Sequence, residues 1–238
     1  MTVDPLVLLP EVDRATERLF RTADGLDDAA ARDPSLLPGW SRGHVLTHLA
    51  RSADAYGRLL TSARTGARVP AYPNDEARAA DIAAGADRSA ADLAADVRAA
   101  AARFADACAG MPPEAWAAEV IVRGRPQLAA TLVWGRLREV EVHHADLDAG
   151  YAPDDWPAAF ALRLLHEVVA DLGHRPGSSA LVLRPDEGRH ELTVGEPEGA
   201  PAISGPVNRI AAWLIGRSEG AGLTVSPDGP LPTPPEWI

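Results

Sequence analysis

Apolar residues recur at three- and four-residue intervals through the first two thirds of the chain, a pattern that predicts amphipathic helices. We expect long helical stretches over residues 9–31, 41–66, 74–109 and 127–149. Ser41 is the expected N-cap of the second stretch, and Gly85 should break the third into two pieces. Four long helices joined by short connections favour an antiparallel four-helix bundle.

The final third of the chain is richer in Pro and Gly and contains short runs of residues that favour strands. We expect strands over 180–185, 190–195, 202–205 and 223–226, with helices over 156–172 and 206–216. A short strand or extended loop is also expected at 119–123. The predicted fold class is therefore α+β, with a helix bundle at residues 1–152 and a smaller C-terminal α/β domain at 153–238.

Charge and hydropathy narrow the range of partners. The 238 residues carry a formal net charge of −11, and this acidic balance argues against binding to nucleic acid. No apolar run approaches the roughly 18 residues of a membrane span. Acidic residues interrupt the first thirty positions, which therefore lack a signal-peptide pattern. We expect a cytoplasmic protein without a membrane partner, either a monomer or a weak homo-oligomer.

Two features of the composition limit the chemistry. All 23 basic residues are arginine, so a Schiff-base lysine and a phosphate-loop lysine are both excluded. Cys108 is the one cysteine, so the chain cannot form an internal disulfide or a cysteine-based zinc site. Its Ala-rich surroundings predict a small buried side chain in a helix.

The segment 138–147 concentrates the candidate chemistry. Glu139 and His143 are four residues apart, so on a helix they lie on one face. At about 100° per residue, that face is the one that carries Leu128 and Leu132, which indicates that it points to the core. Glu141 and His144 would fall off this apolar stripe.

A carboxylate on a buried face needs a partner because an unpaired buried charge is costly. A divalent metal would satisfy Glu139 and His143 together. A hydrogen-bonded pair of the two side chains without a metal would also satisfy them, and the spacing leaves both interpretations open.

A third ligand would have to come from another helix. The second helix offers His44 and His48, again four residues apart, and helical phase favours His48 as the residue that faces the core. His48, Glu139 and His143 would form a set suited to zinc, with one coordination position left open. The sequence contains neither the His-Glu-x-x-His motif of zinc proteases nor the Gly-x-Ser-x-Gly motif of serine hydrolases.

Four segments of the sequence resemble the mycothiol-dependent maleylpyruvate isomerases, a family within the DinB-like metal-binding bundle superfamily. They are GWSRGHVLTHLA (39–50), REVEVHHADL (138–147), AAWLIGRSEGAGL (211–223) and LPTPPEWI (231–238), in the order expected for that family. The resemblance implies zinc held by His48, Glu139 and His143. It also implies a catalytic arginine at Arg217 and mycothiol as the thiol cofactor.

The resemblance also implies a reaction. A thiolate adds to the cis double bond of maleylpyruvate, the resulting single bond rotates, and elimination of the thiol gives trans fumarylpyruvate. Arg217 would bind a substrate carboxylate or the enolate, although an arginine after a helix can instead serve its C-terminus. Arg136 lies near Glu139 in helical phase and is the arginine that we expect to bind the cofactor, ahead of Arg123 and Arg125. Asp146 is a candidate to orient a ligand histidine.

Three other interpretations remain open at the level of sequence. A mycothiol S-transferase would use the same metal and thiol but release a conjugate. A non-catalytic module would close the metal site with a fourth ligand such as His44 or His144. A metal-free bundle would keep only a buried Glu–His pair.

Overall fold

The computed structural model describes residues 4–175, 179–187, 190–234 and 237. The chain divides into two compact units, Met1–Tyr151 and Ala152–Ile238, which we describe separately. The segment 231–238, one of the four that resemble the family, falls partly on residues 235, 236 and 238, outside the described residues.

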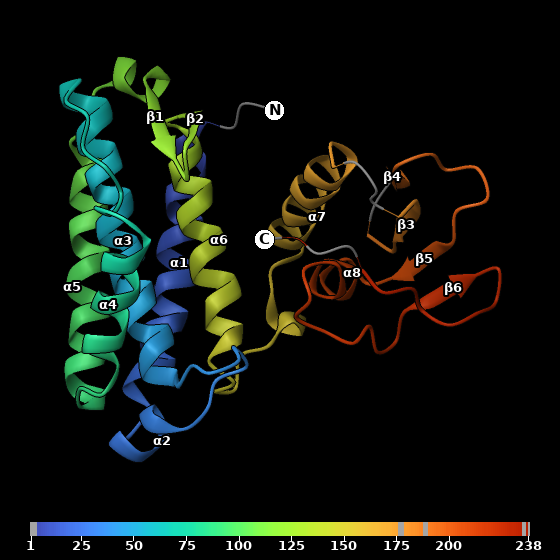
Figure 1. Cartoon of the computed structure of the whole chain (residues 1–238), viewed down its shortest axis with the longest axis horizontal. Coiled ribbons are helices and arrows are strands. Elements are labelled where there is room, and N and C mark those ends of the chain that lie inside the picture. The colour runs from blue at the N-terminus through green and yellow to red at the C-terminus, as the bar shows by residue number, and fades with distance from the viewer. Residues whose placement is uncertain (1–3, 176–178, 188–189, 235–236, 238) are drawn as a thin grey trace. The chain divides into compact units, whose positions relative to one another are not determined.

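The first unit is a bundle of four long helices, shown upright in Figure 1. They are α1 (Pro5–Asp24), α3 (Arg42–Thr65), α5 (Ala90–Ala109) and α6 (Thr131–Asp146). Helix α3 packs against α5 and α6, and α1 packs against the same two helices, so the four enclose a common core. The shorter helix α4 (Asp75–Ala86) packs on α3, and α2 (Asp28–Arg32) joins α1 to α3. The predicted four-helix bundle is confirmed.

Local sequence signals set most helix ends. The Ser41 side chain caps α3 by accepting a hydrogen bond from the backbone N–H of His44, and Gly66 ends the helix at a φ of 71°. Ser89 caps α5 in the same way as Ser41 caps α3. The predicted break near Gly85 is therefore confirmed, with α4 ending at Ala86.

Two predicted helix boundaries are wrong. The stretch 9–31 is two helices, because Gly25 follows α1 and the Asp27 side chain caps a separate α2. The stretch 127–149 begins as a strand: Leu128 belongs to β2 (Arg125–Leu128), which pairs antiparallel with β1 (Glu119–Val122). A local pattern of apolar residues does not show that a neighbouring strand will capture the first turn of a predicted helix.

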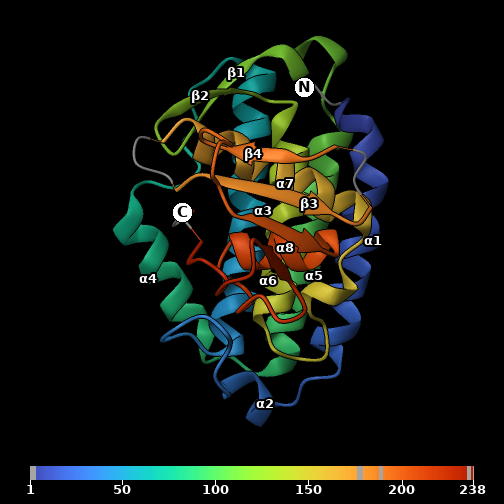
Figure 2. The same cartoon turned by 90° about the vertical axis from the view of Figure 1, so that its right-hand side faces the viewer.

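In its described residues, the second unit combines two α-helices with a four-stranded sheet, and Figure 2 shows the strands in front of the helices. Its elements are α7 (Ala158–Gly173), β3 (Leu181–Pro185), β4 (Leu192–Val194), β5 (Ala202–Gly205), α8 (Val207–Leu214) and β6 (Thr224–Ser226). The strand order is β4-β3-β5-β6, with β3 and β5 parallel and both outer pairs antiparallel. Helices α7 and α8 pack on each other and on the sheet. The predicted α+β class is confirmed. Among the described residues, no helix combines the length and apolarity needed to cross a membrane.

Candidate metal centre

Three side chains from two neighbouring helices converge in the first unit. His48 on α3 and Glu139 and His143 on α6 each offer a ligand atom, and these atoms lie within 4.8 Å of one another. Oε2 of Glu139 is 3.0 Å from Nε2 of His48 and 3.7 Å from Nε2 of His143. The two imidazole rings lie nearly perpendicular, with centroids 4.5 Å apart. The structure thus brings together all three residues that were predicted from the sequence as metal ligands.

Burial and charge favour the charge states of His48 and Glu139 in which these side chains bind metals. His48 is 4% exposed, and burial, the largest influence on it, lowers its pKa below the ordinary histidine value. Burial, the largest single influence, opposes ionisation of Glu139, but His48, His143 and Arg138 together outweigh it and hold the pKa of Glu139 well below its usual range. A neutral imidazole and an ionised carboxylate are the ligand forms that a divalent cation needs.

The polar groups of the cluster do not satisfy one another. Oε2 of Glu139 is buried yet has no aligned hydrogen bond among the described residues, although His48 lies close to it. An ionised oxygen buried without an aligned donor is costly, whereas a cation between the ligand atoms would stabilise it. The donor set of two imidazoles and a carboxylate fits zinc and similar divalent metals.

In the part of the chain that the structure describes, the cluster offers three protein ligands to a metal. His44 is engaged elsewhere: its Nδ1 accepts a hydrogen bond from the backbone N–H of Ser41 at 3.2 Å, in the capping box of α3. Nε2 of His144 lies 2.7 Å from the hydroxyl of Thr22 on α1. A three-ligand site leaves a position for an exogenous group, as catalytic zinc sites do.

Each ligand histidine has a different outer neighbour. Nδ1 of His143 is 2.8 Å from Oδ2 of Asp146, whose side chain is fully buried. This contact fixes the ring and leaves Nε2 facing the cluster. Nδ1 of His48 is 3.3 Å from the guanidinium of Arg78 on α4. Arg78 also lies over the ring of Tyr72, at 5.8 Å from its centroid.

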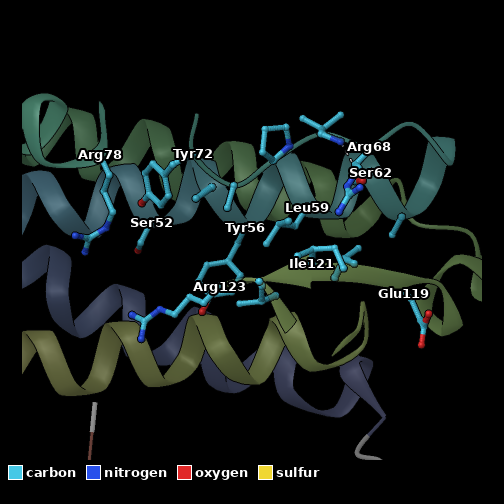
Figure 3. A pocket seen from close by; sticks show the side chains of 18 of the residues that line it. Ser52, Tyr56, Leu59, Ser62, Arg68, Tyr72, Arg78, Glu119, Ile121 and Arg123 are labelled. Atoms are coloured by element: carbon cyan, nitrogen blue, oxygen red, sulfur yellow. Dashed lines mark hydrogen bonds between the residues drawn. The ribbon is translucent and has the colours of Figure 1, made fainter. Parts of the chain in front are cut away.

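A cavity of about 1020 Å³ opens beside the cluster. Figure 3 shows side chains from α3, from the α3–α4 connection, from α4 and from the β1–β2 hairpin along its walls. His48 and Glu139 belong to the wall, and so do three arginines, Arg68, Arg78 and Arg123. A small molecule bound in the cavity would therefore meet both the cluster and positive charge.

Arg136, the arginine expected to bind the cofactor, has a different environment. Its side chain is fully buried, and its guanidinium donates to the backbone oxygen of Leu49 and the hydroxyl of Ser52, both at 2.9 Å. Burial lowers the pKa of Arg136 to about 10. Arg136 is not among the described residues that line the large cavity. Its contacts hold α6 to α3, and its role toward a cofactor stays a prediction.

Arg217, the predicted catalytic arginine, lies in the second unit. It follows α8 and Gly216, whose φ is 73°, and its guanidinium donates to the backbone oxygen of Ile215 at 3.2 Å. This is the helix-terminal contact that the sequence left open as an alternative. Its catalytic role stays a prediction.

Two residues expected off the core-facing stripe of α6 are in fact buried. Glu141 and His144 are each 1% exposed. Glu141 pairs with Arg18 of α1 at 2.5 Å and accepts a hydrogen bond from the Tyr151 hydroxyl at 2.5 Å. Helix α6 therefore buries a second face, against α1, so the prediction that Glu141 and His144 lie off the buried side of the helix is wrong. Leu128, used to define the stripe, lies outside the helix.

Sequence reasoning missed Arg78, Tyr56 and Tyr72 as residues of the cavity wall. Arg78 is the one arginine of the Ala-rich helix α4, and neither its spacing nor its neighbours set it apart. The close approach of α6 to α3 carries a faint signal, because a Cβ at Gly135 would lie 2.6 Å from the Tyr56 hydroxyl. That signal is visible only once the two helices are paired.

The lone cysteine does not take part in the site. Cys108 is buried in α5, as predicted from its surroundings, and burial raises its pKa to about 12. At neutral pH it is a thiol rather than a thiolate and therefore a poor nucleophile.

The protein is thus a helix bundle with a three-residue candidate metal centre, joined to a small α+β unit. The family model described as "Mycothiol maleylpyruvate isomerase N-terminal domain" matches residues 12–148, and the model described as "MDMPI C-terminal domain" matches residues 155–236. The chain belongs to the mycothiol maleylpyruvate isomerase family.

Solved structures agree with the family assignment. The chain is similar to a crystal structure of a mycothiol-dependent maleylpyruvate isomerase, with a TM-score of 0.92 and 29% identity over 99% of this chain and 98% of that one. A histidine-to-alanine mutant of a mycothiol-dependent maleylpyruvate isomerase matches with a TM-score of 0.91 and 28% identity over the same shares. No curated protein sequence matches the chain significantly.

Proposed function

We propose that this protein is a mycothiol-dependent maleylpyruvate isomerase, which converts the cis substrate to trans fumarylpyruvate. The observation that carries the proposal is the convergence of His48, Glu139 and His143 on one point in the wall of a large cavity, in a chain of this family. The neighbours of similar fold bear the same activity in their names.

Zinc is the metal that we propose for the cluster, held by His48, Glu139 and His143. When bound, it would supply a positive charge that stabilises a thiolate at neutral pH. Burial disfavours a charged His48 and Glu139 is ionised, and these are the charge states in which the two side chains bind such an ion.

The nucleophilic sulfur has to come from outside the chain. Cys108 is the one cysteine, and it is a buried thiol with a raised pKa. Mycothiol would supply the sulfur, whose addition makes the cis double bond single and whose elimination after rotation restores it as trans. The use of mycothiol and the presence of arginine at all 23 basic positions both fit an actinobacterial source. We propose that the reaction takes place in the cytoplasm.

The chain's own residues would bind and orient the substrate. Leu59 and the hairpin residues Val120 and Ile121 give the cavity an apolar wall that can exclude water. Arg217 is proposed to bind a substrate carboxylate or the enolate oxygen, because a planar guanidinium suits paired oxygen contacts. We further propose that the C-terminal domain, residues 153–238, closes the site and that Arg136 assists cofactor binding.

The test is an assay of purified protein with zinc, mycothiol and maleylpyruvate. We expect fumarylpyruvate to form only when the thiol is present. The rate of its formation should fall by at least about 100-fold in the Glu139→Gln variant, because one metal ligand is lost. Chromatography of the products checks the outcome. A wild-type protein that forms no trans product, but conjugates mycothiol to a generic electrophile, would instead be an S-transferase.

A further inference from the structure

The loop that joins β1 to β2 contains an arginine that its backbone does not favour. Val122 pairs with Arg125, so the loop has two residues, Arg123 and Gly124. Their φ angles are 48° and 77°, both in the left-handed region. A hairpin loop with two such residues favours Asn, Asp or Gly at its first position. An arginine held there is strained, and turn geometry does not account for it.

Arg123 lines the same cavity as the candidate metal ligands. The hairpin contributes Val122, Arg123 and Gly124 to the wall. In Figure 3 the side chain of Arg123 extends from the hairpin toward the part of the cavity where Ser52 lies. Ser52 is one helical turn beyond His48 on α3, so this is the end of the cavity next to the cluster.

The guanidinium of Arg123 has no hydrogen bond or ion pair with any other described residue. Its charge nevertheless acts within the cavity, because it opposes the rise that burial causes in the pKa of Tyr56. A planar cation with free donors beside a cavity is suited to binding a carboxylate by two parallel hydrogen bonds.

The other two arginines of the cavity are placed differently. Arg78 contacts His48 and lies over the ring of Tyr72. Arg68 belongs to the segment that bonds Ser62, nearly four helical turns or about 20 Å beyond His48 along α3. A substrate anchored at the cluster would not reach Arg68, whereas Arg123 points back toward the cluster.

We propose that Arg123 binds one of the two terminal carboxylates of the substrate and thereby makes the cavity selective for dicarboxylates. This inference rests on the proposed isomerase function. The strained turn is retained because the carboxylate contact needs an arginine at the tip of the hairpin.

The decisive variant is Arg123→Asn, because asparagine suits the turn better than arginine does. We expect its melting temperature to equal or exceed that of the wild type. We expect KM for maleylpyruvate to rise about 10- to 100-fold, which corresponds to the loss of a hydrogen bond to a charged group, and kcat to change less. KM for mycothiol should not change. Arg125→Gln, on the same hairpin but outside the cavity wall, is the matched control and should behave as the wild type.

Binding of heptanedioate, an unreactive dicarboxylate, separates this inference from the isomerase function. Calorimetry should show weaker binding of heptanedioate to Arg123→Asn than to the wild type and to Arg125→Gln. Equal binding to all three proteins, or a rise in KM for mycothiol alone, would overturn the carboxylate role of Arg123. A wild type that binds heptanedioate but does not isomerise maleylpyruvate would overturn the proposed function and leave the carboxylate site standing.

Discussion

The two histidines of the cluster are held by opposite kinds of neighbour. His143 faces the carboxylate of Asp146, whereas His48 faces the guanidinium of Arg78. A carboxylate that accepts from Nδ1 keeps the proton away from Nε2 and makes Nε2 a stronger ligand. A guanidinium can only donate, so a metal on Nε2 of His48, which needs the proton on Nδ1, would require Arg78 to turn away.

At the residue scale, we predict that Asp146→Asn weakens zinc binding by about 10- to 100-fold, because the amide does not fix the tautomer of His143 as the carboxylate does. Isothermal titration with zinc measures the affinity. Asp148→Asn is the control: Asp148 is exposed, and its φ of 52° is one that asparagine adopts readily. An unchanged affinity in Asp146→Asn would show that the contact only packs the ring.

At the scale of elements, α3 is shaped to let α4 approach closely. A Cβ at Gly43 would lie 2.1 Å from the backbone oxygen of Ala86 at the end of α4. This contact is between backbones, so no side-chain movement can relieve it. Since α4 carries Arg78 into the cavity, the glycine in α3 also sets one wall of the site.

We predict that Gly43→Ala destabilises the protein by about 1–3 kcal/mol, because α4 must move to admit the methyl group. Gly57→Ala, in the same helix, has nothing within 4 Å of the added Cβ. It should be stabilising by about 0.5–1 kcal/mol, because alanine favours helix over glycine. Urea unfolding of both variants measures whether each substitution lowers or raises the free energy of unfolding. If the two changes have the same sign, close packing of α4 on α3 is not what Gly43 provides.

For the whole molecule, zinc should stabilise the fold, because a ligand that binds the native state shifts the unfolding equilibrium by mass action. At a free zinc concentration of about 100 Kd the gain is about 2.7 kcal/mol, or several degrees in Tm. Thermal melts with zinc and with a chelator measure the shift. Glu139→Gln should lose most of it, while Glu119→Gln, an exposed carboxylate of the cavity wall, should keep it. A shift that survives in Glu139→Gln would place the zinc elsewhere.

The local part of the site and most of the helices and strands could be predicted from the amino-acid sequence alone. Helix geometry depends on neighbouring residues, so the four-residue spacing of Glu139 and His143 was enough to place them on one face. Capping at Ser41 fixed the start of α3, and helical phase distinguished His48, which faces the core, from His44. The strands of the second unit followed from short runs of residues between turns.

Which helix faces pack against each other depends on contacts between elements that are distant in the chain. Leu128 became a strand residue because β1 pairs with it, and Glu141 and His144 became buried because α1 packs on that side of α6. The packing of α3 on α6 brings His48 to Glu139, and the packing of α4 on α3 brings Arg78 to His48. The β1–β2 hairpin places its tip in the cavity wall. These contacts join residues far apart in the chain, so local periodicity carries no record of them. Their energies depend on how whole helices pack, which is why the cluster was foreseen but the cavity around it was not.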